Sequence, residues 1–233
     1  MRVALVSVGD ELLAGDTVNT NAAWLARQLT DRGVTVERVT AVPDRREDIA
    51  RVVNEYRAEY DAVLVTGGIG PTHDDVTMEA VAAAVGQPME ASDAALEYIE
   101  TQRGYAREDL TDGTAGIPAG GTFIPNPEGV APGCHVENIY VLPGVPEEMR
   151  GMFGEIADQF SGTVQHVERV TVDEPESALL DRIEELRGRF DVTIGVYPGE
   201  YVRVKLSGPD SVTVESAASW LRERVEAPDD QSR

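Results

Sequence analysis

The order of apolar and polar positions in the first third of the chain predicts alternating strands and helices. Residues 3–6 form a continuous apolar run, as in a central parallel strand covered on both faces. Residues 20–28 carry apolar side chains at helical spacing, and Gly33 closes that helix. The pattern then predicts a strand at 34–42, a helix at 45–60, a strand at 61–66 and a helix at 77–85. This alternation predicts a parallel sheet with right-handed crossovers.

The remaining pattern predicts the end of this sheet and a second unit. We expect a helix at 91–102, a loop or irregular helix at 109–121, the last core strand at 139–142 and a helix at 146–159. Strands at 167–172, 192–196 and 202–206, with helices at 176–186 and 212–225, then give a β-α-β-β-α unit. The expected division is a domain at 1–163, a small α/β domain at 164–227 and a disordered tail at 228–233.

The charge of the chain indicates adaptation to a high salt concentration. It carries 42 acidic residues against 19 arginines and a single lysine, Lys205, for a formal net charge of −22. We interpret this as adaptation of a cytoplasmic protein to molar salt, where a Debye length of about 3 Å screens the self-repulsion. We expect no nucleic-acid partner, because the chain is so acidic and the tight glycine turn of the second unit lacks a basic, aromatic-lined face. No apolar run approaches the roughly 20 residues that span a membrane, so no membrane partner is expected either.

A single cysteine, Cys134, excludes an internal disulfide and a cysteine-based zinc cluster. Its position beside His135 is compatible with a nucleophile or a ligand. A small buried residue at the start of a strand is the favoured interpretation.

Residues 61–80 contain the strongest candidate for a functional site. A predicted buried strand runs into a turn with Gly67, Gly68 and Gly70, and two adjacent carboxylates, Asp74 and Asp75, then precede a helix. Glycine allows backbone N–H groups to approach a ligand closely, and a helix N-terminus favours anions such as phosphate. Because carboxylates repel a bare phosphate, their presence predicts a divalent metal between acid and phosphate.

The text of this segment resembles a known family. GGIGPTHDDVT is similar to the GGTG…RD.T signature of the molybdopterin-binding domain family, and TGGIGPTHDDVTMEA resembles the matching segment of CinA-type proteins. SVGDELLAGDTVNTNAAWLARQL, AVPD, PNPEGVAPG and LPGVPEEMRGMF resemble further family motifs in the same order. The resemblance covers residues 1–165 and implies a three-layer α/β/α fold with a mostly parallel sheet. The remainder resembles the small α/β domain of CinA-type proteins, without the amidohydrolase domain that follows there.

The resemblance also implies roles for individual residues. Asp75 and Asp44 stand at the family's two acidic positions and are the candidate catalytic residues. Asp74 stands where the adenylyltransferases of the family have arginine, so Asp74 and Asp75 are the candidate metal ligands. The candidate ligand-binding residues are Ser7, Gly9, Asp10, Gly67, Gly68, Gly70, Thr77, Pro143 and Gly144.

Structural alternatives stay open at several of these positions. Asp75 is also a plausible N-cap of the following helix, and Thr77 can cap that helix or bind phosphate. Asp44 can be a turn residue after proline. Asp10 and Glu11 could add oxygen ligands to a metal or only shape the pocket.

Three functions follow from the resemblance. The first is a metal-dependent nucleotide pyrophosphatase for an ADP-ribose-type substrate, with Mg²⁺, Mn²⁺ or Co²⁺ as the divalent ion and K⁺ as a further candidate. The second is a molybdopterin adenylyltransferase, with molybdopterin as ligand. The third is a non-catalytic module that senses a nucleotide or pterin. The resemblance further implies a homodimer or homotrimer, with a separately encoded amidohydrolase as a candidate partner.

Overall fold

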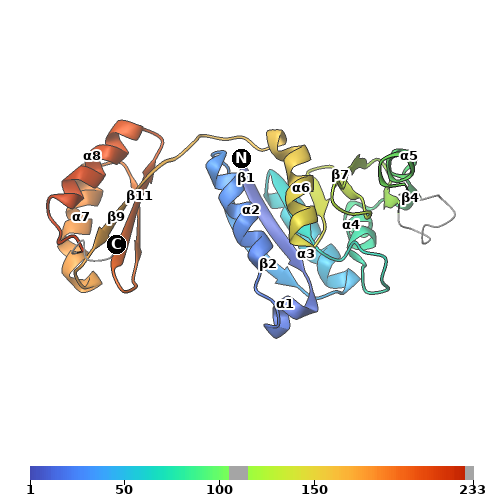
Figure 1. Cartoon of the computed structure of the whole chain (residues 1–233), viewed down its shortest axis with the longest axis horizontal. Coiled ribbons are helices and arrows are strands. Elements are labelled where there is room, and N and C mark those ends of the chain that lie inside the picture. The colour runs from blue at the N-terminus through green and yellow to red at the C-terminus, as the bar shows by residue number, and fades with distance from the viewer. Residues whose placement is uncertain (105–114, 229–233) are drawn as a thin grey trace. The chain divides into compact units, whose positions relative to one another are not determined.

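The computed structural model describes residues 1–104 and 115–228. The chain divides into two compact units, Met1–Gly162 and Thr163–Arg233 (Figure 1). Each unit has its own apolar core. We therefore describe each by itself.

The first unit is built on a sheet that is parallel over most of its width. Within the described residues, its strands follow the order β2-β1-β3-β8-β7-β6. They are β1 (Arg2–Val8), β2 (Thr35–Val42), β3 (Ala62–Thr66), β6 (Thr122–Ile124), β7 (Gly133–Val136) and β8 (Ile139–Leu142). The first four in this order pair in parallel, whereas β7 pairs antiparallel with both of its neighbours, β8 and β6. The predicted α/β class with a mostly parallel sheet is confirmed.

Helices cover both faces of this sheet and make it the middle of three layers. On one face, α2 (Thr20–Asp31) and α6 (Pro146–Ile156) enclose one apolar cluster with Val3 and Leu5 of β1. On the other, α3 (Arg46–Glu59) and α4 (Thr77–Val85) enclose a second cluster with Val6 and Val8. Because both faces are covered, β1 needs apolar side chains in both directions, which explains its unbroken apolar run.

The region around residues 89–136 differs from the expectation. The predicted helix at 91–102 begins at Asp93, after β4 (Met89–Ala91), and α5 (Asp93–Tyr98) continues directly into a π-helical turn, η1 (Ile99–Arg103). Part of the expected loop at 109–121 is β5 (Gly116–Pro118), which pairs antiparallel with β4, so the loop prediction is wrong there. Residues 109–114 of that prediction lie outside the described residues. The strands β4, β5 and β6 were missed because three residues are too few to show an alternation. The strand expected to start at Cys134 is present as β7, which begins at Gly133.

The second unit has the predicted β-α-β-β-α order. It consists of β9 (His166–Val172), a 3₁₀ turn η4 (Glu176–Leu179), α7 (Leu180–Arg189), β10 (Thr193–Tyr197), β11 (Val202–Gly208) and α8 (Ser211–Arg222). The strands form an antiparallel sheet in the order β10-β11-β9. The helices pack on one face of it through Leu179, Ile183, Leu186, Val214, Ala217 and Leu221. Residues 229–233 of the expected tail lie outside the described residues.

Two further sequence-based expectations can be compared with the described residues. None of the helices there is long and apolar enough to cross a membrane. Cys134 is fully buried in β7, and burial raises the pKa of its thiol to about 12. A buried, protonated thiol is a poor nucleophile, which agrees with the packing role favoured for this residue.

The layered core generates a stability prediction. Leu25 of α2 is fully buried against the sheet, whereas Leu13 is 55% exposed. Leu25→Ala is expected to lower the free energy of unfolding by about 2–5 kcal/mol, because it leaves a cavity in a close-packed core. The matched control Leu13→Ala is expected to change it by less than about 0.5 kcal/mol. Chemical denaturation in molar KCl measures both, and equal effects of the two would contradict the core assignment.

Candidate functional site

The carboxyl ends of four parallel strands meet along one edge of the first unit. The register places Ser7 of β1 beside Thr66 of β3, and Thr66 beside Leu142 of β8. Ser7 also joins the strands to α2, because its hydroxyl accepts a hydrogen bond from Asn19 Nδ2 at 3.0 Å. The loops that follow these strands therefore begin next to one another, as predicted for a site in a parallel α/β sheet.

The loops after β1 and β2 are tied together by Asp44. One carboxylate oxygen of Asp44 accepts a hydrogen bond from the backbone N–H of Asp10 at 2.8 Å, and Gly9 N donates to Val42 O at 3.1 Å. Asp10 is the first residue of a short helix, α1 (Asp10–Ala14), which the sequence analysis did not predict. The half-buried Asp44 therefore orients the loop after β1, and the Asp10 side chain remains exposed.

Gly67 is the point where three of the loops touch. Its φ of +99° is a conformation that side chains disfavour, and a Cβ there would overlap the carbonyl oxygen of Val8. Its N–H donates to Leu142 O at 3.1 Å. Gly144 lies on its other side, so close that a Cβ on Gly144 would sit 3.3 Å from Gly67 Cα. Pro143, between Leu142 and Gly144, is buried. The predicted residues at 67, 143 and 144 thus lie together.

Thr77 is the first residue of α4, and its side chain is buried. Its backbone N–H donates to Gly68 O at 3.0 Å, and a Cβ on Gly68 would overlap the Thr77 hydroxyl. That hydroxyl is buried and has no hydrogen-bond partner in the described part of the chain. The N-cap residue is Val76, without a side-chain cap, so the capping alternatives for Asp75 and Thr77 are both wrong. A buried unpaired hydroxyl costs about 1–3 kcal/mol, and a bound ligand that supplies a partner would recover that cost.

The Asp75 carboxylate is held in a fixed orientation through one of its two oxygens. Its Oδ2 accepts from the Thr72 backbone N–H at 3.0 Å and from the Thr72 hydroxyl at 2.6 Å, while Asp75 N donates to Thr72 O at 3.1 Å. Its Oδ1 makes no hydrogen bond to the described residues. Gly70 is needed here, since a Cβ on it would lie 2.6 Å from Oδ2. The loop therefore presents a preorganised carboxylate oxygen.

Asp74 lies beside it and faces solvent. The Thr72 hydroxyl and a backbone N–H lower the pKa of the Asp74 carboxyl, so Asp74 is ionised at neutral pH. The His73 ring is fully exposed, with Nδ1 3.9 Å from an oxygen of Asp74. In this structure His73 is thus a solvated loop residue.

The acidic residues fit one mode of metal binding better than another. Among residues 1–104 and 115–228, no group of three or more His, Cys, Asp or Glu side chains is close enough to hold a metal ion. Asp10, Glu11 and Asp44 thus do not join the Asp74–Asp75 pair in a cluster made only of protein ligands. Mg²⁺ commonly binds through one or two carboxylates and completes its shell with waters and substrate phosphates. Asp74 and Asp75 fit that second mode.

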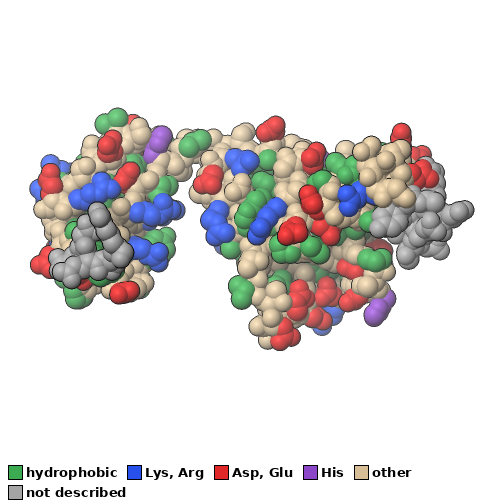
Figure 2. Space-filling model, in the orientation of Figure 1, with side chains coloured by type: hydrophobic (Ala, Val, Ile, Leu, Met, Phe, Trp, Pro, Cys, Tyr) green, Lys and Arg blue, Asp and Glu red, His purple; other side chains and the backbone are tan. Residues whose placement is uncertain are grey.

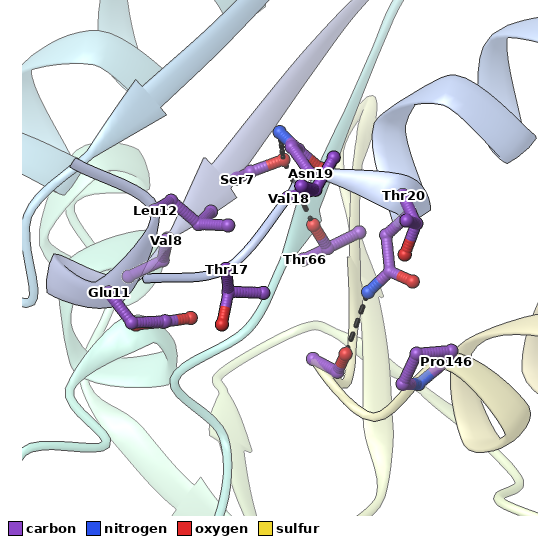
Figure 3. Close-up of a pocket in the computed structure, with 12 residues that line it drawn as sticks. Ser7, Val8, Glu11, Leu12, Thr17, Val18, Asn19, Thr20, Thr66 and Pro146 are labelled. Atoms are coloured by element: carbon purple, nitrogen blue, oxygen red, sulfur yellow. Dashed lines mark hydrogen bonds between the residues drawn. The ribbon is translucent and has the colours of Figure 1, made fainter. Parts of the chain in front are cut away.

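A pocket of about 120 Å³ opens between β1, α2 and the loop after β8 (Figure 3). Among the described residues that line it, Glu11 alone is charged. Its other polar lining residues are Ser7, Thr17, Asn19, Thr20, Asn21 and Thr66. Val8, Leu12, Val18 and Pro146 supply apolar walls. Hydroxyls, amides and apolar walls suit an uncharged polar group, such as a sugar or a heterocycle, better than a phosphate.

Asn19 and Asn21 are site residues that the sequence analysis missed. Asn19 Oδ1 caps α2 by accepting from Ala22 N at 3.0 Å, and its Nδ2 reaches Ser7. Asn21 Nδ2 donates to Gly144 O at 2.7 Å and so ties α2 to the loop after β8. An asparagine at the start of a predicted helix signals a cap, which explains Asn19. Nothing in the local pattern signals a partner 123 positions away.

Comparison with known proteins agrees with this fold. The family model described as "Probable molybdopterin binding domain" matches residues 4–162. A protein of Archaeoglobus fulgidus is 38% identical over 225 residues, which cover 96% of this chain and 97% of that protein. A CinA-like protein of Citrifermentans bemidjiense is 36% identical over 97% of this chain, and the match spans 59% of that longer protein.

A solved structure gives the same result. The crystal structure of "the protein CinA with unknown function" from Thermoplasma acidophilum has a TM-score of 0.63 and 36% identity to this chain. The match covers 68% of this chain and 97% of the Thermoplasma chain.

The contact at Gly67 generates a prediction with an internal control. Gly67→Ala is expected to lower the free energy of unfolding by about 2–4 kcal/mol, because strain at positive φ adds to overlap with the Val8 carbonyl. Gly15 also has positive φ, +79°, but nothing lies within 4 Å of a Cβ there. Gly15→Ala is therefore expected to cost only about 1 kcal/mol. Equal costs in chemical denaturation would refute the close packing of the three loops.

Proposed function

Because this chain belongs to the molybdopterin-binding domain family and is related to CinA-like proteins, we propose that it is a metal-dependent nucleotide pyrophosphatase with an ADP-ribose-type substrate. The observation that carries the proposal is the geometry of Asp75. One of its oxygens is fixed by Thr72, and the other, beside a glycine turn that leads into a helix, makes no hydrogen bond to residues 1–104 or 115–228. An oriented carboxylate next to a glycine turn and a helix N-terminus suits chemistry on a diphosphate.

The two parts of the site match the two parts of such a substrate. The segment from Gly67 to Asp75 would face the diphosphate, and the pocket around Ser7 and Asn19 would receive an uncharged ribose or ring. Glu11 disfavours a phosphate in that pocket, which supports this orientation. Gly67 already donates its N–H to Leu142 O, so Gly68 and Gly70 would supply the backbone N–H donors for the phosphate oxygens.

The proposed reaction is hydrolysis of the diphosphate, in which one of the two P–O bonds to the bridging oxygen is broken. Water attacks phosphorus, the bridging P–O bond breaks, and AMP and ribose 5-phosphate are released. Asp75 Oδ1 would accept the proton from the attacking water or hold it in position. A divalent ion bound through Asp74 and Asp75 would neutralise phosphate charge and polarise phosphorus.

A second function deserves a test because of the family itself. The matching family is described by its binding of molybdopterin, so adenylyl transfer to molybdopterin is the alternative reaction. Asp74 argues against it, since an acid cannot pair directly with phosphate as arginine does. A regulatory module that only binds a nucleotide or pterin is the non-enzymatic alternative, with a separately encoded amidohydrolase as its partner.

Hydrolysis of ADP-ribose in molar KCl tests the proposal. The assay uses Mg²⁺, Mn²⁺ or Co²⁺ and follows AMP release by the wild type, Asp75→Asn and Asp31→Ala. Asp75→Asn keeps an oxygen that can accept from Thr72 but removes the charge, so activity is expected to fall at least about 100-fold. Asp31→Ala, an exposed acid at the end of α2, controls for lost surface charge and is expected to keep full activity.

The other outcomes separate the alternatives. Tight nucleotide binding without AMP release would reject the hydrolase and favour the binding module. ATP-dependent adenylylation of molybdopterin would reject it in favour of the transferase. Activity that does not depend on added metal would remove the metal from the proposal.

We further propose that the protein is a homodimer or homotrimer in a high-salt cytoplasm. Light scattering in concentrated KCl is expected to give two or three times the chain mass of 25.2 kDa. A particle of the single-chain mass would rule out this assembly.

A further inference from the structure

The small unit has one sheet face that its helices do not cover. Val170, Val172, Val202, Val204 and Leu206 point into the core under α7 and α8. Because side chains alternate along a strand, the intervening positions lie on the opposite face. Those positions, which we call the open sheet face, are Val167, Arg169, Thr171, Thr193, Gly195, Tyr197, Arg203, Lys205 and Ser207.

The charge of the open sheet face is opposite to that of the chain. It carries three basic residues and no acidic one, although acids outnumber bases 42 to 20 in the whole sequence. Figure 1 draws α7 and α8 on one side of the strands, and Lys and Arg side chains lie along the strand side of this unit in Figure 2. The open sheet face is therefore a local positive surface on a strongly acidic protein.

The three bases lie close together on neighbouring strands. Lys205 lies directly opposite Arg169 in the β11–β9 pairing, and Arg203 is two positions further along β11. None of them makes an ion pair with the described residues. In the same unit, by contrast, Arg182 pairs with Glu174 and Arg222 with Glu168. Like charges directly opposite one another destabilise a sheet, so this arrangement favours an anionic partner.

An aromatic ring lies among these charges. Tyr197 is 49% exposed, and a Cβ on Gly195 would lie 2.9 Å from its ring and its hydroxyl, so the ring covers Gly195. The register places Arg203 opposite Tyr197 and Lys205 opposite Gly195. The glycine allows the ring to rest against the sheet with basic side chains on the neighbouring strand.

We propose that the open sheet face binds single-stranded nucleic acid. The backbone phosphates contact Arg169, Arg203 and Lys205, and an unpaired base stacks on Tyr197. An acidic polypeptide would use the charges but not the ring, and a duplex would not offer a free base to stack. This proposal departs from the expectation of no nucleic-acid partner, which rested on the acidity of the chain and on the glycine turn of the second unit. The strand pattern alone does not give the register that brings these side chains together.

The test is fluorescence anisotropy with a labelled single-stranded oligouridylate over a series of KCl concentrations. Tyr197→Ala is expected to weaken binding about tenfold, whereas Tyr197→Phe keeps the ring and is expected to bind as the wild type. Arg203→Gln with Lys205→Gln is expected to reduce the slope of log K against log [KCl] by about 1.4, since each contact to a single strand contributes about 0.7.

A matched control uses two arginines on the helical side of the same unit. Arg187→Gln with Arg189→Gln, in the last turn of α7, removes the same charge. The affinity of this variant is expected to stay within about twofold of the wild type, and its salt slope within about 0.3. Circular dichroism confirms that each variant is folded before binding is measured.

Three results would overturn the proposal. The first is absence of binding by the folded wild type at the lowest salt concentration that keeps it folded. The second is an equal loss in the α7 control, which would indicate only diffuse attraction. The third is unchanged binding by Tyr197→Ala together with full competition by polyglutamate, which would assign the face to an acidic polypeptide.

Discussion

The contact between Gly67 and the carbonyl of Val8 sets the geometry on which the rest of the site depends. With a side chain at position 67, β1 and β3 could keep their register, but the loops beyond them could not meet. Gly67 also lies close to Gly144, and Asn21 of α2 donates a hydrogen bond to Gly144 O. Backbone contacts, rather than charged side chains, thus bring the ends of β1, β3 and β8 into one surface.

On this backbone frame, each acidic residue has a different task. Asp44 is used internally, because its carboxylate holds the start of α1. Asp75 binds Thr72 through one oxygen, and its other oxygen has no hydrogen-bond partner in the described part of the chain. Asp74 is exposed and ionised. Side chains of one type at one edge of a sheet therefore differ in availability, and only the hydrogen-bond pattern distinguishes them.

The sequence predicted the main elements well because long apolar periods determine them. The alternation over residues 3–85 is set by burial on two faces, and the β-α-β-β-α order of the second unit by burial on one. Short strands such as β4 and β5 could not be predicted, since their pairing is decided by partners 25 or more positions away. Gly67 was singled out for its flexibility, but its contact with Val8 depends on strand register, which composition does not encode.

The open sheet face has a consequence for how the small unit responds to its solvent. Repulsion between Arg169 and Lys205 weakens the folded state at low ionic strength, and at about 1 M salt the Debye length of about 3 Å largely removes it. The same ions screen the attraction between this face and any polyanion. Potassium chloride therefore both stabilises the unit and competes with an anionic ligand. Salt concentrations that favour folding of the unit oppose binding of a polyanion to the open sheet face.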